Sequence, residues 1–114
     1  MQFINKNFLI KYNYTIIQKG NKTDLSTLNK YSNEEKINII LKKINLDSLY
    51  RIVLLSSQLS GRRIPSKENM IENVKQGLTF VFNENKNNVM HCTEYFNFIV
   101  NSKNNLTINV NINI

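Results

Sequence analysis

The stretch LTINVNINI, from Leu106 to Ile114, decides the fold class that this sequence predicts. Leucine, isoleucine or valine stands at every even-numbered position, and threonine or asparagine stands at every odd-numbered one. Successive side chains of a β-strand point to opposite faces of the sheet, so a period of two is typical of a strand. We therefore expect a strand with one face on a core, tied into a sheet at the end of the chain.

Three segments farther upstream also predict strands. TEYFNFIV (residues 93–100) and LTFVF (residues 78–82) are rich in aromatic and apolar residues, and YRIVLLSS (residues 50–57) is apolar enough for a buried central strand. NENKNN (residues 83–88) predicts a polar connection such as a hairpin turn or a longer loop. Residues 66–75 favour either a short helix or a loop.

One helix is predicted from Ser32 onward. Ser32 and Glu35 have the spacing of a capping box, in which the serine hydroxyl and the glutamate carboxylate each accept a backbone amide. An apolar stripe follows at helical spacing: Ile37, Ile40, Leu41 and Ile44. Acids at the start and lysines at the end match the helix dipole. We expect this helix to pack on the sheet, and Leu46 and Leu49 to extend it.

A helix followed by strands with short connections predicts a two-layer α+β domain. We expect about four mainly antiparallel strands and one main packing helix, within residues 32–114. Residues 1–31 are expected to form an N-terminal extension, in which residues 2–19 are compatible with one or two strands and residues 20–31 are loop-like. The length fits one domain that buries roughly 60–70% of the unfolded surface.

The charge favours a negatively charged partner. Fifteen lysines and arginines against eight acids give a net charge of +7 and a pI near 9.6. A basic surface of this kind attracts polyanions, most often nucleic acid and sometimes an anionic membrane face. Asparagine, lysine and isoleucine make up 48 of the 114 residues and alanine is absent, which is typical of an A/T-rich genome. A single asparagine is therefore weak evidence of function.

Little in the sequence points to catalysis, and we expect no catalytic residue, metal site, cofactor or small-molecule substrate. His91 is the only histidine, and its neighbour Cys92 points to the opposite face if both lie on a strand. The acids are scattered, and no glycine-rich phosphate-binding loop is present. We expect no membrane contact, because no apolar run reaches the roughly 18 residues of a span and the N-terminus lacks a signal-peptide pattern.

Arginine, glycine and proline are rare in this sequence. The stretch LLSSQLSGRRIPSKENM (residues 54–70) holds two of the three arginines, one of the three glycines and the only proline. Gly61 lets the backbone turn, Pro65 stiffens the exit, and guanidinium groups bind phosphate oxygens bidentately. We predict a nucleic-acid-binding turn here, the plainer alternative being an ordinary exposed turn that is basic by accident. The residues predicted to bind RNA are Arg51, Gln58, Ser60, Arg62, Arg63, Lys67, Lys75, Lys42 and Lys43.

The order of four segments after the helix carries a family resemblance. The segments are SSQLSGRR (residues 56–63), KQGLTF (residues 75–80), TEYFNF (residues 93–98) and TINVNINI (residues 107–114). Together they resemble the C-terminal domain of the small-subunit ribosomal protein three family, in its divergent organellar form. In that family a strand runs into a Ser-Gly-Arg-Leu motif and a basic turn, and a glycine-led strand follows.

The family's motif fits this sequence in either of two registers. In the first register, residues 57–59 stand where the motif is expected, and its glycine and arginine are missing. In the second register, residues 60–62 stand there. We prefer the first register, which makes residues 60–63 the basic turn, Gly77 the start of a strand and Tyr95 the counterpart of the family's tyrosine. The family's N-terminal domain, with its Gly-x-x-Gly loop, is absent from this sequence, which fits a gene split into two pieces.

The resemblance implies a structural constituent of the mitochondrial small ribosomal subunit, encoded in the organelle, that supports translation. The implied partners are ribosomal RNA of the small-subunit head, neighbouring small-subunit ribosomal proteins and a separate chain carrying the N-terminal domain. A function of another class stays open: a small viral or mobile-element α+β protein that binds a protein partner. Its apolar segment Phe3–Ile17 would then be the interaction surface.

Overall fold

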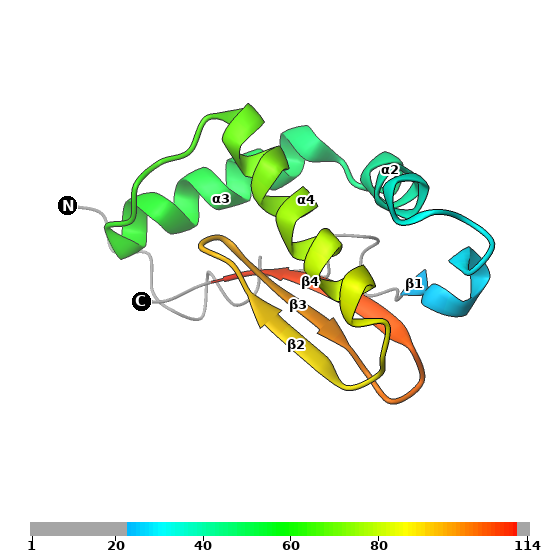
Figure 1. Cartoon of the computed structure of the whole chain (residues 1–114). Coiled ribbons are helices and arrows are strands. Elements are labelled where there is room, and N and C mark those ends of the chain that lie inside the picture. Colours follow the sequence, from blue (N-terminus) through cyan, green and yellow to red (C-terminus); the bar gives the residue numbers. More distant parts are fainter. Residues whose placement is uncertain (1–22, 112–114) are drawn as a thin grey trace.

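The computed structural model describes residues 23–111, which form a sheet with three helices on one of its faces (Figure 1). The elements follow the chain in this order: β1 (Thr23–Asp24), the 3₁₀ turn η1 (Leu25–Leu28), α2 (Asn33–Lys43), α3 (Leu46–Ser60), α4 (Lys67–Glu84), β2 (Val89–Cys92), β3 (Phe96–Val100) and β4 (Asn105–Val110). The predicted α+β class is confirmed. Three helices, rather than one main helix, make up the second layer of the described part.

The sheet is antiparallel throughout, with the strands in the spatial order β1-β4-β3-β2. β3 and β4 pair from Phe96 against Val110 onward, within the two segments that predicted them. The end of the second segment, residues 112–114, lies outside the described residues. Thr23 of β1 pairs with Leu106, so the sheet includes residues that the sequence assigned to an N-terminal extension.

The strands predicted within residues 2–19 and the proposed partner-binding segment Phe3–Ile17 also lie outside the described residues. Of the residues predicted as an extension, those from Thr23 onward are part of the folded unit. Leu28 of η1 is only 4% exposed and belongs to the hydrophobic core.

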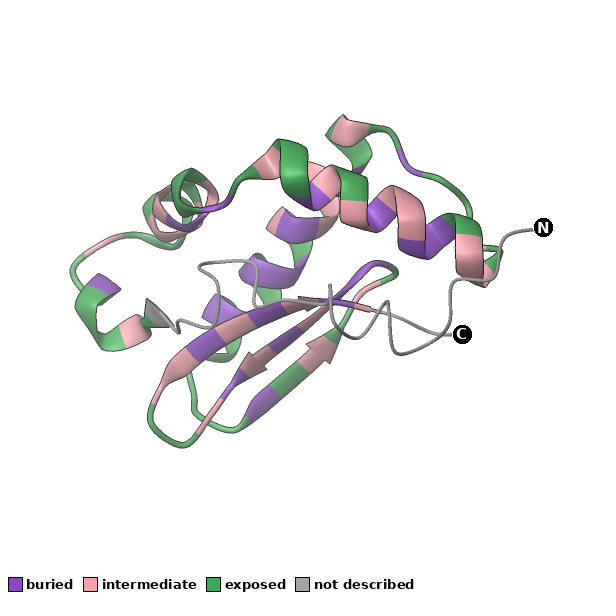
Figure 2. Cartoon of the chain, turned by 180° about the vertical axis from the view of Figure 1, so that it is seen from behind, coloured by how far each residue is buried: buried purple, intermediate pink, exposed green. Residues whose placement is uncertain are grey.

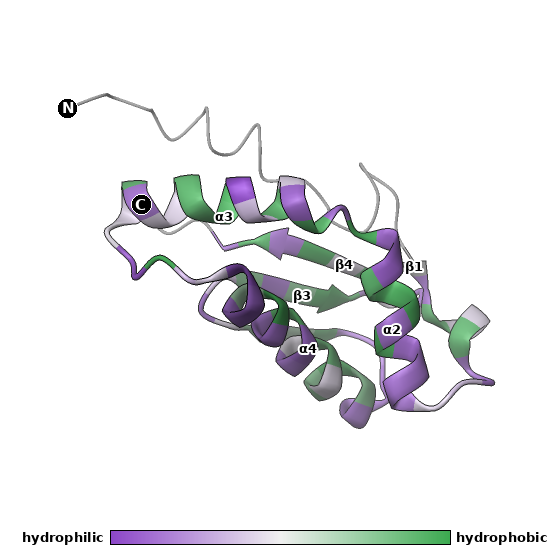
Figure 3. Cartoon of the chain, turned by 90° about the horizontal axis from the view of Figure 1, so that it is seen from above, coloured by the Kyte–Doolittle hydropathy of each residue, from purple (hydrophilic) through white to green (hydrophobic). Residues whose placement is uncertain are grey.

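The core lies between the sheet and the helices. Buried and partly exposed residues alternate along β3 and β4 (Figure 2). Seen from the helical side, α2, α3 and α4 surround the strands and cover this buried face (Figure 3). The largest fully buried side chains come from both layers: Phe96, Phe98, Ile40, Leu49, Met70, Leu78, Leu106 and Ile108.

The helix predicted from Ser32 is α2, and its capping box is present. The Glu35 amide donates to the Ser32 hydroxyl, and the Ser32 amide donates to the Glu35 carboxylate, each at 3.2 Å. Ile40, from the predicted stripe, is fully buried. Local side-chain chemistry therefore defines the start of this helix, as the sequence indicated.

The strand predicted over residues 50–57 is wrong, because this segment lies in α3. The Asn45 side chain accepts the Ser48 amide at 3.1 Å and begins a new helix, so Leu46 and Leu49 do not extend α2. An apolar run of this length is compatible with a buried helix as well as a strand. Helical spacing places one set of residues against the core: Leu49, Val53, Ser56 and Ser57.

The strand predicted over residues 78–82 is also wrong, because α4 continues through it. The uncertain residues 66–75 begin this helix, and the Ser66 hydroxyl caps it by accepting the Asn69 amide at 3.1 Å. Alternation over five residues is outweighed by a longer helical pattern of buried residues: Met70, Val74, Leu78 and Val81.

Gly77 brings α4 close to β3. A Cβ atom at this position would lie 2.0 Å from Cε1 of Phe98, so any side chain would overlap the aromatic ring. Gly77 lies inside α4, whereas the family resemblance implied that it starts a strand. The close approach explains a glycine in a helix interior, where it costs roughly 1 kcal/mol relative to alanine.

The sequence did not predict β2. The strand expected after the loop of residues 83–88 was the one over residues 93–100. In the structure, α4 extends to Glu84, and Asn85 and Asn88 adopt positive φ angles of 49° and 58° before β2 begins. β2 is four residues long, which is too short for an alternating pattern to stand out in the sequence.

Candidate nucleic-acid interface

The predicted basic turn connects α3 to α4. Gly61 ends α3 in the left-handed conformation, with φ of 72°, a role for which glycine is favoured because it has no Cβ. The chain then passes through residues 61–66, which we call the α3–α4 connection. The turn at Gly61 is present, although a helix and not a strand leads into it.

Two tyrosines hold the backbone of the α3–α4 connection in place. The Tyr50 hydroxyl, from α3, donates to the Pro65 carbonyl oxygen at 2.7 Å. The Tyr95 hydroxyl, from the residue before β3, donates to the Arg63 carbonyl oxygen at 2.9 Å. The connection is therefore fastened to both the helical layer and the sheet.

Arg62 faces inward and links α3 to the ends of two strands. Its Nε donates to the Ser60 hydroxyl at 2.8 Å, and Nη1 donates to the Glu94 carbonyl oxygen at 2.7 Å. Its Nη2 donates to the carbonyl oxygen of Asn111, just after β4. All three guanidinium nitrogens are thus engaged within the chain, so Arg62 is a structural clasp rather than a free phosphate-binding group.

Arg63, the next residue, faces solvent. Its side chain is 77% exposed, and its nearest carboxylate is that of Glu94 at 3.8 Å, which is itself 44% exposed. Exposed ion pairs of this kind contribute about 0–1 kcal/mol, because water screens both partners. The guanidinium of Arg63 can therefore exchange Glu94 for another anion at little cost.

Lys67 of α4 pairs with the exposed Asp47 carboxylate of α3, and Arg51 lies nearby on α3. The Lys67 ammonium donates to Asp47, and this hydrogen bond, with the attraction between the charges, lowers the pKa of the Asp47 carboxyl. Arg51, one helical turn after Asp47, adds a smaller attraction that lowers the same pKa. The two cations and one carboxylate leave a net positive charge at this site.

The other predicted RNA-binding residues are dispersed. Ser60 is used internally, since its hydroxyl donates to the Ser56 carbonyl oxygen at 2.7 Å as well as accepting from Arg62. Lys75 lies 3.8 Å from Glu72 on α4. The remaining three are exposed, on α2 and α3: Lys42, Lys43 and Gln58. Within residues 23–111, no side-chain hydrogen bond or ion pair joins Lys42, Lys43 or Gln58 to the α3–α4 connection.

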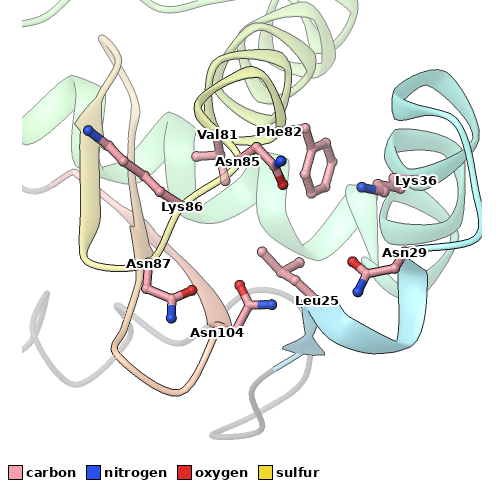
Figure 4. Close-up of a pocket in the computed structure, with 9 residues that line it drawn as sticks. All are labelled: Leu25, Asn29, Lys36, Val81, Phe82, Asn85, Lys86, Asn87 and Asn104. Carbon is pink, nitrogen blue, oxygen red and sulfur yellow. The ribbon is translucent and has the colours of Figure 1, made fainter.

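Sequence reasoning missed a pocket at the far end of α4, which we call the amide pocket (Figure 4). It has a volume of about 170 Å³ and lies among η1, α2, the end of α4 and the loops beside the strands. Its polar lining consists of Asn29, Asn85, Asn87, Asn104, Lys36 and Lys86. The sequence offers only a weak signal for it, the dense asparagine in residues 83–88 and 101–105, which an A/T-rich genome explains equally well.

Features typical of metal sites and membrane spans are absent from the described part of the chain. No group of three or more His, Cys, Asp or Glu side chains in residues 23–111 is placed to hold a metal ion. None of the helices there has the length and apolar character needed to cross a membrane. His91 stacks on Phe80 with ring centres 4.0 Å apart, whereas Cys92 is exposed.

Comparisons with protein-family models, with curated proteins and with solved structures gave no match. The segments SSQLSGRR and KQGLTF, which carried the resemblance, lie mainly in α3 and α4, where the resemblance implied strands. TEYFNF overlaps β3 at residues 96–98, and TINVNINI overlaps β4 at residues 107–110, where the resemblance implied strands. Function must therefore be argued from the chemistry of the surface.

Proposed function

We propose that this chain is an RNA-binding structural protein of the mitochondrial small ribosomal subunit. Its principal contact is the solvent-facing side of the α3–α4 connection, and its ligand there is the phosphate backbone of ribosomal RNA. The observation that carries this proposal is the position of Arg63, which is 77% exposed on a backbone fixed from both sides.

The mechanism rests on exchange of one anion for another. A phosphate displaces the Glu94 carboxylate from Arg63 and takes two hydrogen bonds from the guanidinium fork. Arg62 acts indirectly, by holding the end of α3 against the sheet so that Arg63 keeps its direction. Arg51 and Lys67 supply further positive charge beside the connection, while Asp47 keeps them partly neutralised until phosphate arrives.

Charge in the rest of the sequence supports a polyanionic partner. Residues 1–22 contain four lysines and no acid, so much of the net charge of +7 belongs to this segment. Electrostatic attraction of this kind is independent of nucleotide sequence and weakens with salt, because binding releases counterions from the phosphates. Neighbouring ribosomal proteins and a separate chain with the family's N-terminal domain complete the proposed set of partners.

The direct test is a double-mutant cycle on Arg63 and Glu94. RNA binding is measured by filter retention with a small-subunit ribosomal RNA fragment over a range of salt concentrations. Arg63→Ala should weaken binding and reduce the log–log salt slope by about 0.7–0.9, the value for one lost phosphate contact. Glu94→Gln should strengthen binding, because it removes the carboxylate that competes for Arg63.

The cycle separates a local contact from a general effect of net charge. In the Arg63→Ala background, Glu94→Gln should give no gain beyond that of Glu34→Gln, which removes an exposed acid at the start of α2. Equal gains from Glu94→Gln and Glu34→Gln in the otherwise native chain would show that Arg63 is not the contact. Wild-type affinity and slope for Arg63→Ala would contradict the proposed interface.

The cellular assignment is tested by sedimentation of native extract on a sucrose gradient. A ribosomal constituent should travel with small subunits and leave them when ribonuclease degrades the RNA. Recovery only as an RNA-free monomer or dimer would favour the alternative of a viral or mobile-element protein that binds a protein partner.

A further inference from the structure

The amide pocket differs in chemistry from the α3–α4 connection. Four asparagine side chains contribute to its lining, and Figure 4 shows the amides of Asn29, Asn85 and Asn104 gathered around the opening. No carboxylate is among the described residues that line it. A primary amide offers both a donor and an acceptor, so this lining suits a neutral ligand that carries both kinds of group.

The backbone gives two of these asparagines a fixed position. Asn85, after α4, and Asn104, before β4, have positive φ angles of 49° and 60°, which asparagine and glycine tolerate better than other residues. The Leu25 amide donates to the Asn104 carbonyl oxygen at 2.9 Å and holds η1 against the turn between β3 and β4. The amides are therefore presented by a braced frame rather than by free loops.

Positive charge lies beside these amides. Lys36 is half-buried, with its ammonium 5.4 Å from the centre of the Phe82 ring. Lys86 lies 3.8 Å from the Glu84 carboxylate and is 67% exposed. The carbonyl end of α4 carries partial negative charge, which disfavours a phosphate deep in the pocket. A neutral group inside and a phosphate near the lysines fit this distribution.

The size of the amide pocket suits a small neutral group. A volume of about 170 Å³ is below the roughly 300–1,000 Å³ typical of pockets for drug-sized ligands. The pocket adjoins a more open hollow of about 590 Å³, which shares four lining residues with it: Asn29, Lys36, Phe82 and Asn85. The amide pocket itself therefore has room for one small heterocyclic ring, and the neighbouring hollow leaves space for the sugar and phosphate attached to it.

We propose that the amide pocket receives a single unpaired RNA base, whose adjoining phosphate contacts Lys36. Unpaired bases expose hydrogen-bonding edges with both donors and acceptors, which asparagine amides can match. Leu25, Val81 and Phe82 supply the apolar part of the lining. This inference rests on the proposed RNA-binding function and adds a second contact, selective for single-stranded RNA, at the opposite end of α4.

The test uses glycine substitutions that remove amides while keeping the backbone. Glycine accepts positive φ, so the variant Asn85→Gly with Asn104→Gly loses two amides and retains the turns. The matched control is Asn88→Gly, since Asn88 has φ of 58° but does not line the pocket. Binding is measured by fluorescence anisotropy with a labelled single-stranded RNA octamer and with the same sequence as a duplex.

The double glycine variant should bind the single strand about tenfold more weakly, the scale of one lost base-edge contact. Its affinity for the duplex should stay within twofold of the wild-type value, and Asn88→Gly should change neither affinity. Lys36→Gln is a second variant, which should lower single-strand affinity without touching the turns. Wild-type single-strand affinity in both variants, or equal losses for single strand and duplex, would overturn the inference.

The two RNA contacts fail in different ways. If Arg63→Ala weakens ribosomal RNA binding and the pocket variants leave single-strand binding unchanged, the pocket inference is wrong and the proposed interface stands. If the pocket variants weaken single-strand binding and Arg63→Ala has no effect, the pocket inference stands and the interface at the α3–α4 connection is wrong.

Discussion

The helical layer meets the sheet in different ways at the middle of α4 and at the end of α3. In the middle of α4 the contact depends on a missing side chain, because Gly77 lets the helix backbone approach the Phe98 ring. At the end of α3 it depends on a long polar side chain, because Arg62 reaches the carbonyl oxygens of Glu94 and Asn111. One junction is apolar and fully buried, and the other is polar and half-buried.

The two helices also meet each other through an exposed pair, Lys67 and Asp47. Steric overlap in a buried core lowers the free energy of unfolding more than the loss of half-buried hydrogen bonds does. The loss of an exposed ion pair lowers it least. The three junctions should therefore rank in that order when each is disrupted.

Gly77→Ala should have the largest effect. The added Cβ overlaps a ring that cannot retreat, since Phe98 is fully buried. We expect the free energy of unfolding to fall by about 3 kcal/mol, at the upper end of the cost of overpacking and despite the better helix propensity of alanine. Urea denaturation followed by circular dichroism measures this loss.

A compensating change tests the cause. Phe98→Leu, which makes room opposite the helix, should cost less in the Gly77→Ala background than in the native chain, giving a favourable coupling in a double-mutant cycle. Gln76→Ala, at an exposed neighbouring position on α4, is the control and should stay within about 0.5 kcal/mol. Additive effects of the two core changes would contradict the close contact.

Arg62→Ala should have the intermediate effect. It removes charge-assisted hydrogen bonds to two carbonyl oxygens and one hydroxyl, and we expect a loss of about 2 kcal/mol in the free energy of unfolding. Arg62→Lys should recover only part of this loss, because an ammonium lacks the planar fork. Arg63→Ala is the control and should show little change in the same urea denaturation. Equal losses for Arg62→Ala and Arg63→Ala would contradict the structural role of Arg62.

Asp47→Asn should have the smallest effect, and its size should depend on pH. The hydrogen bond and charge of Lys67 lower the pKa of Asp47 in the folded state from its ordinary value of 3.8. The stabilising contribution is therefore present above pH 3.8 and disappears as the pH falls through the lower, folded-state pKa. The difference in urea midpoint between wild type and variant should shrink over that acidic range, whereas a constant difference would argue against the pair.

The same comparison bears on function, because Arg62 and Arg63 are adjacent and identical in type. The sequence predicted both as RNA contacts, and nothing local distinguishes them. Arg62 is committed to atoms 32 and 49 residues away along the chain, at Glu94 and Asn111, and such contacts are invisible in a local pattern. Only the exposed Arg63 keeps its guanidinium available to a ligand in the proposed function.

Part of the fold was predictable from the sequence. The capping box at Ser32 and Glu35 located α2, and alternation located β3 and β4, because these signals act over a few neighbouring residues. Residues 50–57 and 78–82 were predicted as strands because short apolar runs are compatible with both helix and strand. Their helical state depends on packing against partners distant in the chain, such as Phe98 opposite Gly77.

The amide pocket was not predictable, because its asparagines come from three separate parts of the chain. Asn29 follows η1, Asn85 and Asn87 follow α4, and Asn104 precedes β4. In a sequence with 21 asparagines, no local signal separates these from the others. Only the folded backbone brings these asparagines to one place.

The sequence by itself determined the net charge of +7, the start of α2, the β3–β4 hairpin and the α+β class, since each follows from composition or from local periodicity. Tertiary structure alone decided that Arg62 is a clasp while Arg63 faces water, and that dispersed asparagines form one pocket. The physical reason is that these outcomes depend on contacts between residues far apart in sequence, which local propensity does not encode.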